Sequence, residues 1–113
     1  MRIVTDSITL EDLRVMAAAL FGNLVKGVVD VERELLALDA ELHSDFEAIL
    51  FQNGSQQRDL WEVNLYPDET SDNFLEFDAM INVRPSQNNR SRGVEDETTR
   101  QRISRVIGLR IRQ

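Results

Sequence analysis

The chain contains no cysteine, and this absence excludes several classes of protein at once. Disulfide-stabilised domains, thiolate zinc sites, iron–sulfur clusters and thiol nucleophiles all need that side chain. The sequence also has no stretch approaching the roughly 18 continuous apolar residues of a membrane span, and its first ten residues lack the apolar core of a secretion signal. We therefore expect a cytoplasmic protein that is stabilised by packing, makes no contact with a membrane and requires no cofactor.

Basic residues are scarce and unevenly placed. The 113 residues include 13 Lys and Arg against 20 Asp and Glu, a net charge of -7. Residues 1–83 contain 5 basic and 17 acidic residues, a net charge of -12, whereas residues 84–113 contain 8 arginines and 3 acids, a net charge of +5. Because an acidic surface repels the phosphate backbone, the chain as a whole is not expected to bind nucleic acid.

Three interpretations of the arginine-rich segment are open. Arg100, Arg102, Arg105 and Arg110 could form a solvated helix face that offsets the acidic remainder of the chain. They could instead dock on an acidic surface of a second copy or of another protein, because guanidinium groups bind carboxylates through paired hydrogen bonds. A local contact with nucleic acid is the third, although no aromatic residues are interleaved with the arginines. The second interpretation predicts a homo-oligomer or a complex with a protein partner.

Two segments have the periodicity of amphipathic helices. In residues 9–22 the apolar side chains recur at spacings of three and four, Thr9 is suited to the N-cap, and Gly22 is suited to the end of the helix. From residue 96 onward a narrow apolar stripe follows Asp96, which is a second N-cap candidate. We therefore predict one helix near each end of the chain.

Alternating apolar residues predict strands between these helices. The pair Asn53-Gly54 is typical of a type I′ hairpin turn, because both residues tolerate a positive φ. The short connections favour an antiparallel meander over parallel pairing, which needs longer crossovers. Strands are expected at residues 26–38, 45–52, 60–66 and 74–83, although the apolar spacing of residues 26–42 also fits a helix.

These elements predict a single α+β domain over residues 1–113, which is enough chain for one hydrophobic core. Its order is an N-terminal helix, a four-stranded and mainly antiparallel meander, and a C-terminal helix. We expect the helices to cover one face of the sheet, with Trp61 buried against the first helix. The stretch at residues 68–73 is expected to be a loop.

The single histidine suggests one candidate site. If residues 41–47 are extended, Glu41, His43 and Asp45 share one face, and the preceding strand adds Asp30. Imidazole beside carboxylates is suited to a divalent metal or to general-base chemistry near neutral pH. A structural or surface histidine, or one at an interface, is the alternative. In a helix the pattern would be lost, because residues two apart do not share a face.

A second group of polar residues surrounds the later predicted strands. Asn64, Asn82 and Arg84 are expected to converge near one end of the sheet, where amide and guanidinium donors could hold an anionic or polar ligand. The alternative is that they satisfy carbonyl groups of loops.

Several segments together resemble a family of short bacterial and cyanobacterial proteins catalogued only as a domain of unknown function. The resemblance extends over nearly the whole chain, which implies one intact domain, but it implies no activity and transfers no functional residue. The segments that carry it are residues 28–32, 41–45, 53–55, 60–67, 81–87 and 89–91.

Two functional hypotheses follow from the sequence. The first is a small interaction or binding module that self-associates through an acidic surface and the arginine-rich helix. The second is a small metal-dependent or acid/base hydrolase centred on His43 and the neighbouring carboxylates. The sequence has no glycine-rich phosphate loop, no Gly-x-Ser-x-Gly elbow and no paired-histidine metal motif, which favours the first hypothesis.

Overall fold

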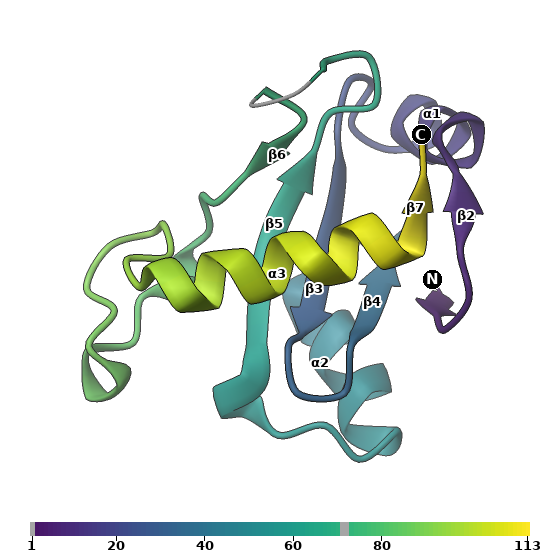
Figure 1. Cartoon of the computed structure of the whole chain (residues 1–113). Helices are drawn as coiled ribbons and strands as arrows, with labels where there is room; N and C mark the ends of the chain where they lie inside the picture. Colours follow the sequence, from purple (N-terminus) through teal and green to yellow (C-terminus); the bar gives the residue numbers. More distant parts are fainter. Residues whose placement is uncertain (1, 71–72) are drawn as a thin grey trace.

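The computed structural model describes residues 2–70 and 73–113, and the predicted loop at 68–73 therefore lies partly outside it. Within the described residues the chain forms three α-helices and seven short strands (Figure 1). The helices are α1 (Leu10–Ala19), α2 (His43–Gln52) and α3 (Glu97–Arg110). The strands are β1 (Arg2–Val4), β2 (Ile8–Thr9), β3 (Val25–Asp30), β4 (Leu35–Leu38), β5 (Leu60–Leu65), β6 (Leu75–Glu76) and β7 (Ile111–Arg112).

Five of these strands form an antiparallel sheet in the order β1-β4-β3-β5-β6, and β2 and β7 form a separate parallel pair. The mixed helix and sheet composition confirms the predicted class. The four-stranded meander was wrong, because β5 pairs with β3 instead of its predecessor β4. In the described part of the chain, no helix is long and apolar enough to cross a membrane.

Both predicted helices begin at the predicted caps. The Thr9 hydroxyl accepts a hydrogen bond from the Asp12 amide at 3.1 Å, and the Asp12 carboxylate accepts one from the Thr9 amide at 3.0 Å. The Asp96 carboxylate accepts from the Thr99 amide at 2.8 Å. Each cap satisfies amide groups that the first helical turn leaves without intrahelical partners, and each acid also lies at the positive end of the helix dipole.

The segment predicted as one strand over residues 26–38 is a hairpin of β3 and β4. Asp30 makes the turn, because one oxygen of its buried carboxylate accepts hydrogen bonds from the Glu32 and Arg33 amides at 3.0 and 2.9 Å. The other oxygen accepts from the Ser55 hydroxyl at 2.6 Å. Glu34 completes the turn with a φ of 55°. Asp30 is therefore part of a turn and lies apart from the other predicted ligands.

The segment predicted as a strand at 45–52 is helix α2, and Asn53-Gly54 ends this helix instead of forming a hairpin turn. The amide of Gly54, which has a φ of 90°, donates to the Phe51 carbonyl, and the Ser55 amide donates to the Leu50 carbonyl, both at 3.0 Å. These two bonds make the Schellman motif of a helix C-terminus. The predicted positive φ is present at Gly54, where it serves a helix end, but not at Asn53, whose φ is -92°.

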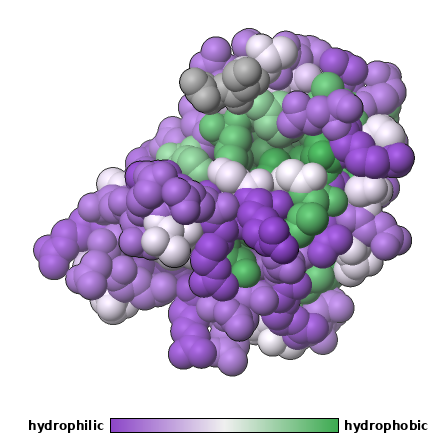
Figure 2. Space-filling view, viewed as in Figure 1, coloured by the Kyte–Doolittle hydropathy of each residue, from purple (hydrophilic) through white to green (hydrophobic). Residues whose placement is uncertain are grey.

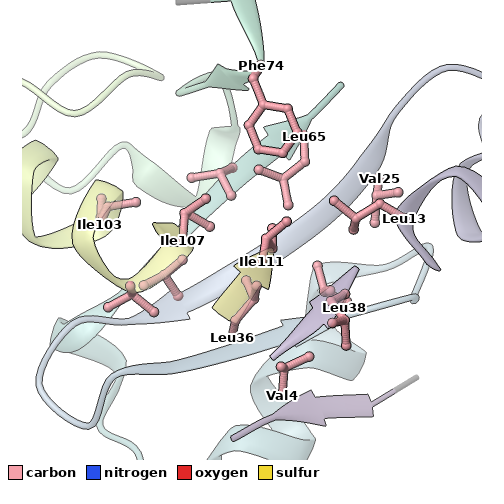
Figure 3. Packing of buried hydrophobic residues seen from close by; sticks show 14 of the residues in the cluster. Val4, Leu13, Val25, Leu36, Leu38, Leu65, Phe74, Ile103, Ile107 and Ile111 are labelled. Carbon is pink, nitrogen blue, oxygen red and sulfur yellow. The ribbon is translucent and has the colours of Figure 1, made fainter. Parts of the chain in front are cut away.

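Helices lie on both faces of the sheet, whereas coverage of one face was predicted. α1 and α3 cover the front face, where they enclose the larger hydrophobic core together with β7 (Figures 1 and 3). α2 covers part of the opposite face through a smaller cluster. That cluster contains Val28, Ala37, Ala40, Phe46, Leu50 and Leu60.

Trp61 is buried, as predicted, in the core cluster that also contains Leu13, Met16 and Ala17 of α1. It lies opposite Val29 in β3. The Arg84 guanidinium stacks on its ring, 4.0 Å from the centroid.

The acidic partner of the arginine-rich helix lies within the same chain. Arg102 Nη2 is 3.1 Å from Glu32 Oε2, and Arg105 Nε is 3.0 Å from Glu34 Oε2, so α3 is tied to the β3–β4 turn. Arg100 pairs with Glu97 of its own helix and donates to the Val94 carbonyl. Figure 2 shows this face of α3 as a hydrophilic band beside an apolar hollow. Self-association through Arg100, Arg102 and Arg105 stays a prediction.

Arg110 connects three segments and allows a first test of these contacts. Its guanidinium donates to the carbonyls of Thr5 and Asp6 and, at 3.0 Å, to that of Glu34. We expect Arg110→Ala to lower the free energy of unfolding by about 1.5–3 kcal/mol, the range for hydrogen bonds from charged groups. Arg105→Ala removes one exposed ion pair and should cost at most about 1 kcal/mol. Urea unfolding measures the free energy of unfolding of both variants. Equal losses of stability in the two variants would contradict this distinction.

Candidate functional site

One half of the rear face of the sheet is left open by the short helix α2. Along a strand, residues two apart point to the same face, and residues paired across neighbouring strands also share a face. Lys26 and Val28 of β3 therefore lie on the same face as Leu60 and Glu62 of β5. Ten helical residues extend about 15 Å, and α2 covers the end with Val28 and Leu60. The other end of this face, with Lys26 and Glu62, opens into a pocket.

This pocket, called the Glu62 pocket below, has a volume of about 280 Å³. Its floor comes from β3 and β5, one wall from the residues that lead into α2, and the other from residues 78–81 with Arg92. An ion pair closes the second wall, because Arg92 Nε lies 2.6 Å from Asp78 Oδ1. The lining residues are Lys26, Glu41, Leu42, His43, Glu62, Asp78, Ala79, Met80, Ile81 and Arg92.

Glu62 is an unusual residue for the floor of a pocket, because it is only 6% exposed. Among the described residues, no group donates a hydrogen bond to its carboxyl oxygens. Burial raises the pKa of this carboxyl, while the charges of Lys26 and His43 act in the opposite direction and lower it. Lys26 lies opposite Asn64 and is therefore a diagonal neighbour of Glu62 on the sheet.

On the outer edge of β5, the backbone of Glu62 forms hydrogen bonds with a side chain and not with a neighbouring strand. The fully buried Asn82 accepts a hydrogen bond from the Glu62 amide and donates one to the Glu62 carbonyl, both at 2.9 Å. A strand was predicted over residues 74–83, but the described part of this segment pairs with β5 only at Leu75 and Glu76. A 3₁₀ turn, Met80–Asn82, then directs Asn82 inward and leaves Met80 exposed.

Asn64 and Arg84 also lie along this edge of β5. The Asn64 amide donates to the Glu76 carboxylate at 2.9 Å and to the Asp78 carbonyl at 3.3 Å. The Arg84 guanidinium donates to the Leu60 carbonyl, and burial lowers its pKa. The three residues predicted to converge therefore do lie along one strand edge. Their donors are directed mainly at backbone carbonyls, as in the alternative interpretation of this group.

Of the four residues in the predicted histidine site, two line the Glu62 pocket and two do not. Glu41 and His43 line it, whereas Asp45 lies on the exposed first turn of α2 and Asp30 holds the β3–β4 turn. His43 Nε2 lies 3.1 Å from Glu47 Oε1, one helical turn away. The expected shared face is absent because this segment is helical.

A metal centre receives no support from this arrangement. Within residues 2–70 and 73–113, no group of three histidine, aspartate or glutamate side chains could hold a metal ion.

Lys26 and Glu62 were not predicted as site residues from the sequence. In the strand predicted at 60–66, Glu62 alternates with Trp61 and Val63, which is the pattern of an acid facing solvent. Its burial depends on α2 and on residues 78–81, which lie far away in the sequence and were predicted as strands.

A second cavity, of about 380 Å³, lies beside Trp61 at the start of α3. Its two acids are already in use, because Glu95 accepts hydrogen bonds from the Arg90 and Ser91 amides and Asp96 caps α3. These bonds hold the pKa values of both carboxyls below the usual range. The Glu62 pocket, with its acid free of donors in the described structure, is the better candidate site.

The contact between Asn82 and Glu62 predicts a large effect of a small substitution. Asn82→Ala leaves two backbone groups buried without partners and should destabilise the fold by about 2–4 kcal/mol. Asn23→Ala, at an exposed position, should change stability by less than about 0.5 kcal/mol. Urea unfolding compares the two variants. A loss below about 1 kcal/mol for Asn82→Ala would show that the amide is dispensable.

Comparison with known proteins gives one match. No curated protein and no solved structure matches the chain. The family described as "Protein of unknown function (DUF5674)" matches residues 2–109. This range includes every residue that lines the Glu62 pocket. The resemblance noted from the sequence is thus confirmed, and the chain belongs to this family of proteins of unknown function.

Proposed function

We propose that this domain is a binding module that takes a small polar ligand in the Glu62 pocket. The observation that carries the proposal is the carboxyl of Glu62, which is nearly buried, receives no hydrogen bond from the described residues and faces an open cavity. A ligand that offers hydrogen-bond donors would satisfy this group.

Energetics favour a binding role for Glu62 over a structural one. Burying an acid without donors costs free energy, and an apolar residue at this position of the buried strand β5 would avoid that cost. The surrounding structure nevertheless fixes the acid in place, since Asn82 holds its backbone and Lys26 lies beside it. Groups with perturbed pKa values in a pocket are frequent in functional sites.

Acid/base chemistry is a second candidate function for the same pocket. The observation that favours it is that Glu62, with its raised pKa, and His43 lie on one cavity and interact electrostatically. Such a pair could pass a proton to or from a bound substrate. Self-association through the arginines of α3 is a separate proposal, which concerns the opposite face of the sheet.

The pH dependence of stability tests the burial of Glu62. Because its pKa is raised in the folded state, stability is lost as pH rises from the ordinary carboxyl pKa of about 4.3 through the raised value. Glu62→Gln cannot ionise, so we expect its free energy of unfolding to exceed that of the wild type at pH 7.5, by a margin that shrinks as the pH is lowered to 4. Urea unfolding at both pH values measures this. A difference that does not depend on pH would contradict the burial.

Titration with small organic probes tests the binding function. Hexylammonium, hexanoate, hexanol and hexanamide are added separately to ¹⁵N-labelled protein, and amide chemical shifts are followed by NMR. We expect at least one probe to shift the amides of Lys26, Glu62 and Met80 in a saturable manner. Glu62→Gln should weaken this binding, whereas Glu11→Gln, on α1 at the opposite face, should not. If all four probes leave the pocket amides unshifted, the proposal fails.

A further inference from the structure

We infer that the ligand of the Glu62 pocket is an ammonium cation on an apolar chain, bound by the carboxylates of Glu62 and Glu41 and by the side chains of Leu42 and Met80. This inference rests on the proposed binding function and names the class of ligand.

The first argument is the balance of charge in the pocket. The Arg92 and Asp78 side chains neutralise one another in an ion pair. The ammonium group of Lys26 lies over the Phe21 ring, 5.4 Å from its centroid, and its positive charge offsets one negative charge of the pocket. Glu41 and Glu62 remain as two acids without ion-pair partners among the described residues. The pocket therefore has an excess of negative charge.

The second argument is the match of donors to acceptors. A carboxylate only accepts hydrogen bonds, and an ammonium group supplies three donors and a positive charge. A cation at the floor of the pocket would provide the hydrogen bonds that the Glu62 carboxyl lacks. An anionic ligand would instead meet the nearly buried Glu62 carboxylate, where repulsion is screened less than in water, and the exposed Glu41 carboxylate beside it.

The third argument is the apolar rim of the pocket. Leu42 and Met80 are 62% and 66% exposed, among the most exposed large hydrophobic side chains of the described chain, and both line this pocket. A single exposed hydrophobic residue is ordinary, but two beside one polar cavity indicate a ligand with an apolar part. The flexible Met80 side chain can adapt to the shape of that part.

The size of the pocket limits the ligand. A volume of about 280 Å³ is just below the usual range for small-molecule sites. A short chain with one ammonium group fits this volume, and most of its apolar part would lie on the rim. Hexylammonium is therefore a suitable probe, and methylammonium is its matched control because it lacks the chain.

The experiment compares dissociation constants measured from the NMR shifts of the pocket amides. We expect hexylammonium to bind at least tenfold more tightly than hexanoate and at least tenfold more tightly than methylammonium. Glu62→Gln and Glu41→Gln should each weaken hexylammonium binding, the first by at least tenfold. Met80→Ala should reduce the ratio of the methylammonium dissociation constant to the hexylammonium dissociation constant. Val15→Ala removes an equally exposed side chain from α1 and should leave the ratio unchanged.

Each outcome bears on a different part of the inference. Tighter binding of hexanoate, hexanol or hexanamide than of hexylammonium at the pocket amides would overturn the ammonium assignment and leave the proposed binding function standing. Equal affinities of hexylammonium and methylammonium would overturn the role of Leu42 and Met80. Pocket amides that respond to none of the probes would overturn both the inference and the proposed function.

Discussion

The hydrogen-bonding groups on the outer edge of β5 impose the constraint on which the candidate site depends. β3 pairs with β5 along its full length on the inner side, but the described part of β6 pairs with only two residues on the outer side. The remaining backbone groups are buried and need partners. The Asn82 amide and the Arg84 guanidinium supply them at Glu62 and Leu60. These bonds attach residues 78–84 to the sheet, and this attachment builds one wall of the pocket.

The second determinant of the site is the length of α2. A longer helix would cover the whole rear face of the sheet and fill the space above Glu62 with apolar side chains. The helix begins only at His43, on the rim of the pocket, whereas its other end, the Schellman motif at Gly54, lies beside Asp30 at the β3–β4 turn. The strand edge and the short helix thus leave the same half of one sheet face open, and the acid lies on its floor.

Local signals could be predicted from the sequence, whereas distant ones could not. The caps Thr9 and Asp96 were predicted correctly because their partners lie three residues away. The positive φ at Gly54 was also predicted, but a helix end and a hairpin turn share that requirement, and only packing of α2 decides between them. The β3–β4 turn was missed although its hydrogen bonds to Asp30 are local, because residues 31–34 contain no glycine, proline or asparagine that would mark a turn. The site was recognised in part, through Glu41 and His43, and its central acid was not.

The parallel pairing of β2 with β7 also determines when the protein can fold during synthesis. Residues 8–9 have no strand partner until residues 111–112 have left the ribosome, so the front core cannot close earlier. Until then the emerging chain exposes apolar surface that favours aggregation. The first 83 residues carry a net charge of -12, and this charge keeps unfinished chains apart by repulsion. The arginines that offset part of this charge are made after it, on the helix that completes the front core.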